Sequence, residues 1–199
     1  MYSNYLKKYL DFLFAWILLI ILGPLWLLIS LSLFFSQGKT ILFFQDRTGK
    51  DGIRFRLIKF RTLLPAHPSD LSIENRKFTP LGRFLRKTGL DEIPQLVNII
   101  KGHMSFVGPR PMPIKYESKY SDQQLDRFTV KPGITGYAQI NGRNNISWET
   151  RFKMDSWYVK NQSFRLDFKI FLITVFHLSS QLLFSKEQDR NMPVFNGSN

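Results

Sequence analysis

An uncharged apolar run from Phe12 to Phe35, interrupted by Gly23-Pro24, constrains what this chain can fold into more than any other part of the sequence. The run is long enough to cross a bilayer, which takes about 20 apolar residues. It is also longer than the apolar part of a secretory signal, roughly 7–15 residues, and no small-residue cleavage site follows it. A buried core helix is the alternative for so apolar a segment. We therefore expect the chain to meet a membrane.

The position of Pro24 leaves two topologies open: a kinked helix that spans the bilayer, and a re-entrant hairpin that enters and leaves by one face. Each half of the run holds about a dozen residues, roughly 18 Å of helix, too short to span alone. Positive residues stand before the run and after it, at Lys7, Lys8, Lys39, Arg47, Lys50, Arg54 and Arg56. Because positive flanks stay on the cytoplasmic side, the sequence favours the re-entrant form with both ends in the cytoplasm.

The charge and composition limit the partners that the chain can have. The formal net charge is +13, from 28 Lys and Arg against 15 Asp and Glu, which implies an anionic partner. Nucleic acid, an anionic membrane surface and a phosphorylated substrate all fit this excess. The absence of cysteine excludes disulfides, zinc–cysteine sites, iron–sulfur clusters and a cysteine nucleophile. The three histidines lack metal-ligand spacing.

The region after the apolar run predicts a small β-hairpin. Residues 41–44 are β-like, a polar turn rich in Gly and Asp follows, and residues 53–60 alternate between apolar and basic. The proline-containing segment 64–78 is predicted to be a loop, and long loops in compact domains are often lids over a site.

Helical patterns account for most of the remaining sequence. The predicted helices cover residues 81–100, 112–128 and 148–159. A fourth, over 168–184, is apolar with one polar stripe, so it lies in the membrane interface or packs on the domain. The predicted fold class is α+β, mainly helical, with a re-entrant membrane anchor over residues 1–38 and a cytoplasmic-face domain over 39–199 that carries amphipathic interfacial helices.

The pair Asp91-Glu92 is the first candidate for chemistry. Pro94 is tolerated only near the start of a helix, so a new helix is expected to begin close to Asp91. A helix start stabilises a carboxylate in its charged form and also attracts phosphate. The ordinary alternative is that both acids are helix caps.

Two basic positions are candidates for binding an anion. Prolines on both sides of Arg110 fix the local backbone, and a rigidly presented guanidinium suits bidentate binding of phosphate. An incidental surface arginine in a proline-rich turn is the alternative. Lys59 stands at the end of the predicted strand 53–60, where it is either part of a basic binding edge or a solvated strand end.

These motifs, in this order, resemble the bacterial sugar transferase family of small monotopic phosphoglycosyl transferases. The resemblance covers nearly the whole chain, from the broken apolar segment to Leu166-Asp167. The matching stretches are Lys59-Phe-Arg-Thr62, Leu90-Asp-Glu-Ile-Pro-Gln-Leu96, Met104-Ser-Phe-Val-Gly-Pro-Arg-Pro111, Pro132-Gly-Ile-Thr-Gly136, Gln139-Ile-Asn-Gly-Arg143 and Ser147-Trp148-Glu149. The chain departs from the family pattern at four positions. Gly23, Leu63, His103 and Lys131 stand where the family usually has Ser, Met, Asp and Arg.

The resemblance implies a two-step reaction at the cytoplasmic face of the bacterial inner membrane. A UDP-sugar gives its phosphosugar to the aspartate of the Asp-Glu pair and UMP leaves; polyprenyl (undecaprenyl) phosphate then attacks the covalent intermediate. The implied nucleophile is Asp91 with Glu92 as its partner, and the same two carboxylates are the implied ligands of Mg²⁺. Lys59, Arg86 and Arg110 align with substrate-binding positions, and Asp167 is a weaker match. The implied domain 39–199 is catalytic.

A basic membrane adaptor or a nucleic-acid binder is the competing class, supported by the net charge of +13. However, no basic run approaches five or six consecutive residues, and such a protein gives the Asp-Glu and Pro-Arg-Pro stretches no purpose. We therefore expect a UDP-sugar, polyprenyl phosphate and membrane lipids as partners, and no nucleic acid.

Overall fold

The computed structural model describes residues 2–63, 78–142, 145–183 and 194–197. The predicted lid therefore lies outside the described residues, except for Phe78. The α-helices are α1 (Lys7–Ile21), α2 (Gly23–Gln37), α3 (Pro80–Thr88), α4 (Gln95–Ile100), α5 (Asp122–Leu125), α6 (Tyr137–Ile140), α7 (Trp148–Asn161) and α8 (Phe164–Leu183). The strands are β1 (Leu42–Thr48), β2 (Arg54–Phe60), β3 (Ser105–Val107) and β4 (Gly133–Thr135). The mainly helical α+β fold is thus confirmed.

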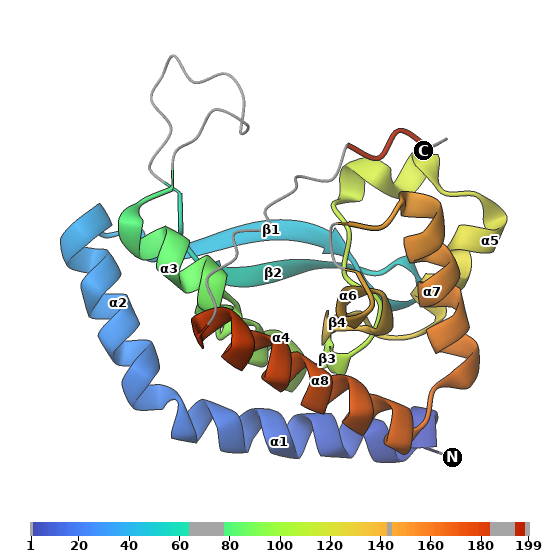
Figure 1. Ribbon diagram of the computed structural model, residues 1–199, viewed down its shortest axis with the longest axis horizontal. Helices are drawn as coiled ribbons and strands as arrows, with labels where there is room; N and C mark the ends of the chain where they lie inside the picture. Colours follow the sequence, from blue (N-terminus) through green and yellow to red (C-terminus); the bar gives the residue numbers. More distant parts are fainter. Residues whose placement is uncertain (1, 64–77, 143–144, 184–193, 198–199) are drawn as a thin grey trace.

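The apolar run forms the two helices α1 and α2, which meet at a bend of 61° (Figure 1). The break falls at Leu22, and Pro24 lies in the first turn of α2, where its missing N–H costs nothing. The predicted break is confirmed. Among the described residues, no single helix is long and apolar enough to cross a membrane. The bent pair α1–α2, taken together, has the length and the apolar composition of a membrane segment.

Helix α1 packs on the rest of the chain rather than standing apart from it. It runs along α4, and the carboxylate of Asp11 accepts a hydrogen bond of 3.3 Å from the N–H of Phe106. The C-terminus of α2 is also attached, because Arg61 donates to the carbonyl of Gln37 and the Gln37 amide donates to Thr79 at 3.0 Å. The boundary at residue 38 stays a prediction.

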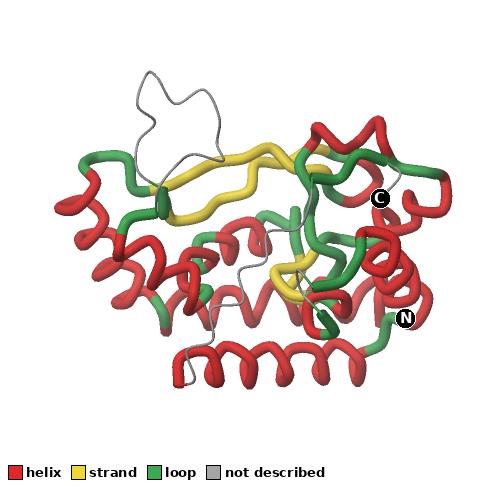
Figure 2. Tube along the Cα trace, turned by 45° about the horizontal axis from the view of Figure 1, so that its top comes forward, coloured by secondary structure: helices red, strands yellow, loops and turns green. Residues whose placement is uncertain are grey.

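The predicted hairpin is confirmed. β1 and β2 pair antiparallel from Leu42 opposite Phe60 to Thr48 opposite Arg54, so β1 runs four residues further than its sequence pattern indicated. The alternation of β2 places Phe55 and Leu57 in the core. Figure 2 shows the hairpin extending across the body, with a second, much shorter pair of strands near its turn end.

The predicted helix over 81–100 is divided into α3 and α4 by a single turn of 3₁₀ helix, η4 (Leu90–Glu92). Gly89 ends α3 with φ 71°, a left-handed conformation that glycine adopts without strain. Helix α3 lies directly on the end of β2, since a Cβ on Gly82 would stand 2.0 Å from the carbonyl oxygen of Thr62. This contact places η4 beside the end of β2.

The prediction of one surface helix over 112–128 is wrong. The segment holds two 3₁₀ turns, Ile114–Lys119 and Asp126–Thr129, on either side of the short α5. Tyr116 and Arg127 are buried, and Ser121 starts a new helix with a capping box to Gln124. Side chains that point into the core from turns, and a serine that favours a cap, outweigh the helical pattern.

The helices predicted at 148–159 and 168–184 are confirmed as α7 and α8. Ser147 caps α7 by accepting from the N–H of Thr150. The core beside α7 is mainly aromatic and consists of Met112, Tyr116, Trp148, Phe152 and Phe195. The sequence analysis missed the parallel pairing of β3 with β4, which places Ser105 opposite Gly133 and Val107 opposite Thr135.

Candidate active site

Asp91 lies in η4 and is a nearly buried carboxylate, with only 7% of the residue exposed. Burial raises the pKa of Asp91 to about 6, and the charge of Glu92 adds to the increase, while Lys59, Arg86 and Arg110 oppose it. No residue in the described part of the chain donates a hydrogen bond to this carboxylate. Asp91 is therefore a carboxylate held close to cations but not bound by them.

The neighbouring Glu92 has the opposite environment. Its Oε1 is ion-paired with the Lys59 ammonium and lies 3.3 Å from Nη2 of Arg110. Burial acts to raise the pKa of Glu92, but these two cations and their hydrogen bonds lower it to about 2. Two adjacent carboxylates are thus separated by environment, one fixed as an anion and the other able to change its protonation near neutral pH.

The cations around this pair come from three separate elements. Lys59 is in β2, Arg110 follows β3, and Arg86 is in α3, where its exposed guanidinium lies over the ring of Phe78 at 4.6 Å. Of the six residues predicted from the sequence, the fold therefore brings five together: Lys59, Arg86, Asp91, Glu92 and Arg110.

Asp167, the sixth, makes its contacts elsewhere. Its carboxylate is ion-paired with buried Lys7 and accepts hydrogen bonds of 2.7 Å from the hydroxyls of Tyr2 and Tyr158. These contacts join the start of α1 to α7 and α8. The substrate-binding role of Asp167 stays a prediction, and the observed contacts are those of a residue that holds the N-terminal segment in place.

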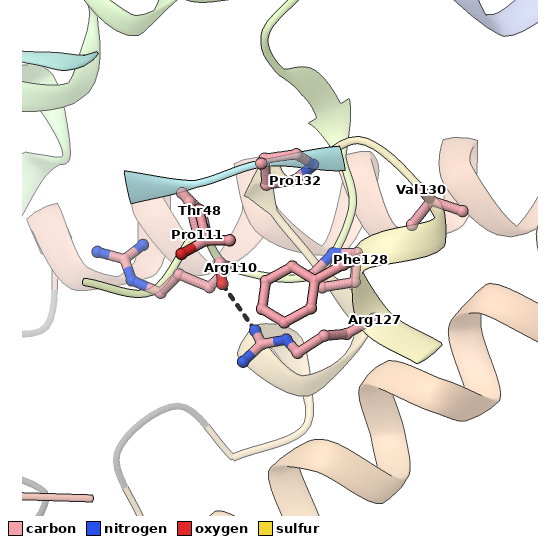
Figure 3. A pocket seen from close by; sticks show the side chains of 9 residues that line it. Thr48, Arg110, Pro111, Arg127, Phe128, Val130 and Pro132 are labelled. Atoms are coloured by element: carbon pink, nitrogen blue, oxygen red, sulfur yellow. Dashed lines mark hydrogen bonds between the residues drawn. The ribbon is translucent and has the colours of Figure 1, made fainter. Parts of the chain in front are cut away.

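Two arginines that the sequence analysis did not name as site residues support Arg110. Nη1 of Arg47 donates to the carbonyl of Pro111 at 3.0 Å, and Nη2 of Arg127 donates to the carbonyl of Arg110 at 2.7 Å. Figure 3 shows the second bond at the edge of a small hollow beside the Pro-Arg-Pro turn. For Arg127, the sequence did contain a signal. Its partner Asp155 lies on the same face of the predicted helix as Trp148 and Phe152, and an acid on an apolar face indicates a buried ion pair.

Comparison with known proteins places the chain in a family. The model of the bacterial sugar transferase family matches residues 2–181. The uncharacterised sugar transferase EpsL of Bacillus subtilis is 49% identical over 140 residues, which cover 69% of this chain and 69% of that protein. The undecaprenyl-phosphate galactose phosphotransferase of Salmonella typhimurium is 37% identical over 191 residues, covering 86% of this chain and 40% of that protein.

A further relative is the UDP-glucose:undecaprenyl-phosphate glucose-1-phosphate transferase of Escherichia coli. It is 34% identical over 186 residues, covering 87% of this chain and 40% of that protein. The chain thus spans 40% of the length of each of these two named transferases. The match over residues 2–181 shows that the chain belongs to the bacterial sugar transferase family of enzymes.

Proposed function

We propose that the protein transfers a phosphosugar from a UDP-sugar to undecaprenyl phosphate and releases UMP, as the first membrane step of glycoconjugate assembly. The names of the Salmonella and Escherichia relatives support this class of reaction. The observation that carries the proposal is the contrast between two adjacent carboxylates. Buried Asp91 accepts no hydrogen bond from the part of the chain that the structure describes, whereas the charge of Glu92 is matched by Lys59 and Arg110.

The proposed mechanism has two displacements at one phosphorus atom. An oxygen of ionised Asp91 attacks the phosphorus that bears the sugar; that O–P bond forms as the bond to the bridging oxygen breaks, and UMP leaves with the electron pair. An oxygen of undecaprenyl phosphate then attacks the same phosphorus and displaces Asp91, which returns to its starting state. A carboxylate nucleophile divides one difficult displacement into two.

The residues around Asp91 have separate tasks in this scheme. Glu92 keeps Lys59 and Arg110 at the site, and the side chain of Arg110, which is 40% exposed, can also reach an incoming phosphate. Arg86 adds positive charge from the last turn of α3. Burial of Asp91 removes water from the attacking oxygen, which raises its nucleophilic strength.

The carboxylates fit Mg²⁺ in one particular way. Within the described ranges, no three His, Cys, Asp or Glu side chains come together as a metal site. Mg²⁺ is commonly held by one or two carboxylates plus substrate phosphates and water, so Asp91 would bind it together with the diphosphate, with Glu92 beside it. When bound, the ion would neutralise charge on the diphosphate and the leaving group.

The exposed apolar surface supports a monotopic membrane location. Large apolar side chains are exposed along α1, α2 and α8, including Phe12, Phe14, Trp16, Ile20, Leu27, Leu28, Phe35, Phe168, Leu172 and Phe176. Such a surface is unusual for a soluble protein and is typical of contact with lipid. We propose that the pair α1–α2 is re-entrant at the cytoplasmic face and that α8 lies in the interface.

The nature of the leaving nucleotide tests the proposed reaction. The purified protein, given a UDP-sugar, undecaprenyl phosphate and Mg²⁺, is expected to release UMP, and chelation by EDTA is expected to stop the release. Release of UDP would instead indicate a transferase that forms a glycosidic bond. No nucleotide release from any of a panel of UDP-sugars would favour a non-enzymatic membrane adaptor.

The topology can be tested with single cysteines, because the chain has none of its own. Lys8→Cys and Lys39→Cys lie on the two sides of the apolar pair and are both exposed. In sealed spheroplasts, an impermeant thiol reagent is expected to label neither position until the membrane is opened. Adding Pro24→Ala should heal the break and favour a spanning helix, so that Lys8→Cys becomes accessible. Labelling of Lys8→Cys with Pro24 intact would rule out the re-entrant form.

Arg110→Lys is expected to lower kcat/KM for the UDP-sugar ten-fold or more, about 1.4 kcal/mol, because the ammonium keeps the charge but loses the planar fork. The matched control is Arg54→Lys, which alters an exposed ion pair between β2 and Glu117. The control should leave turnover unchanged. A near-normal rate for Arg110→Lys would show that Arg110 is only part of a structural turn.

A further inference from the structure

The backbone around Arg110 is held on both sides by neighbouring strands. The carbonyl of Pro109 accepts from the N–H of Gly133 at 3.0 Å, and the carbonyl of Met112 accepts from the N–H of Thr48 at 3.3 Å. Prolines have no N–H to donate, so the conformation of this turn depends on what its carbonyl groups accept.

Side chains hold the two carbonyls in between. Arg47 donates to Pro111, and Arg127 donates to Arg110 itself. Four consecutive carbonyl groups are therefore hydrogen-bonded, while the side chain of Arg110 extends toward Glu92. Of these four bonds, the one from Arg127 acts directly on the residue whose guanidinium faces the site (Figure 3).

Arg127 is itself held firmly. Its side chain is 2% exposed, and Nη2, the nitrogen that donates to Arg110, lies 3.0 Å from Oδ2 of Asp155. Its guanidinium carbon stands 5.8, 5.7 and 5.2 Å from the ring centroids of Tyr120, Phe128 and Phe152. A guanidinium enclosed by three rings and one carboxylate has little freedom, so it fixes the position of the carbonyl to which it donates.

We infer that Arg127 is a positioning residue that orients Arg110 for binding a substrate phosphate. Asp155 in turn holds Arg127 in position. The inference rests on the proposed function of Arg110. Arg127 touches no substrate in this scheme; it fixes the backbone of Arg110 so that the guanidinium of that residue stays beside Glu92 and Asp91.

A double-mutant cycle tests the inference, because a residue that acts only through Arg110 loses its effect when the Arg110 side chain is removed. The variants are Arg127→Lys, Arg110→Ala and the two together. Lysine keeps a positive charge for Asp155, but one ammonium on a shorter side chain cannot reproduce the bond to the Arg110 carbonyl. The two readouts are the affinity for UDP by titration calorimetry and kcat/KM for UMP release.

We expect Arg127→Lys to weaken UDP binding and kcat/KM about ten-fold when Arg110 is present, and less than two-fold when Arg110 is alanine. An equal loss in both backgrounds would overturn the inference, as would wild-type values for a folded Arg127→Lys. Calorimetry tests the role of Arg127 separately from the proposed reaction. If the wild type binds UDP through Arg110 but never releases UMP, the proposed reaction is wrong, yet the dependence of Arg127 on Arg110 can still be measured from UDP affinity.

A second variant covers the case in which Arg127→Lys does not fold. In Arg127→Met, Arg151 remains as a cation near Asp155. The double-mutant cycle of Arg127→Met with Arg110→Ala is interpreted in the same way. Affinity and rate are expressed per mole of folded protein, determined by circular dichroism. Arg54→Lys is the matched control, because Arg54 is exposed and pairs with Glu117; it should change neither affinity nor rate.

Discussion

Asp91→Asn is expected to abolish turnover, with a loss of at least about a thousand-fold in kcat, while the protein becomes more stable. Asparagine keeps the size of the side chain and much of its hydrogen-bonding shape, but it cannot displace UMP. Binding of the UDP-sugar should survive. UMP release and UDP calorimetry measure the two effects side by side. A variant that turns over at one tenth of the wild-type rate would show that Asp91 is not the nucleophile.

The gain in stability follows from the raised pKa of Asp91. The folded state holds the proton more tightly than the unfolded chain, so stability from this group is complete below its ordinary pKa of 3.8 and is lost as pH rises through about 6. Above pH 7 the charged carboxylate therefore costs stability, and its removal should return on the order of 1–3 kcal/mol. Thermal unfolding of both proteins at pH 4 and pH 8 should show the gain only at pH 8.

Asp155→Ala is expected to cost about 3–5 kcal/mol, because it leaves buried cations without their carboxylate. Asp155 is 2% exposed, and burial raises its pKa while Arg127 and Arg151 lower it. The measurement is chemical unfolding of the wild type and the variant in the same detergent.

The control for Asp155→Ala is on the same helix. Glu149→Ala removes an acid from an exposed i,i+4 pair with Lys153 and should leave the unfolding midpoint unchanged. If Asp155→Ala unfolds at the wild-type midpoint, the ion pair with Arg127 contributes nothing, and the fixed position of Arg127 has to come from its aromatic neighbours alone.

Local signals in the sequence predicted the parts of the fold that depend on a few adjacent residues. Pro24 fixed the break between α1 and α2, and alternation in residues 53–60 predicted β2. The Asp91-Glu92 pair was expected near a helix start, and it lies in the single 3₁₀ turn before α4, between Gly89 and Pro94. At the helix break and at the Asp91-Glu92 turn a proline or a glycine sets the backbone, and in β2 the alternation of side chains does so, without help from distant parts of the chain.

Contacts between residues far apart in the sequence could not be predicted from local patterns. Each of β3 and β4 is three residues long, and their parallel pairing joins segments separated by all of α5. The family resemblance named Lys59 and Arg110 as substrate-binding, but nothing in the sequence showed that both meet one oxygen of Glu92. Arg127 lies in the segment predicted to be a surface helix, and the structure shows it to be buried against α7.

Intact-protein mass spectrometry after incubation with a UDP-sugar and Mg²⁺, without undecaprenyl phosphate, tests the central claim most directly. The wild type is expected to gain the mass of one phosphosugar, released again when undecaprenyl phosphate is added, and peptide mapping should place it on Asp91. Asp91→Asn should gain nothing. An adduct on another residue, an adduct on Asp91→Asn, or UMP formed only when both substrates are present and without any adduct would contradict the covalent mechanism.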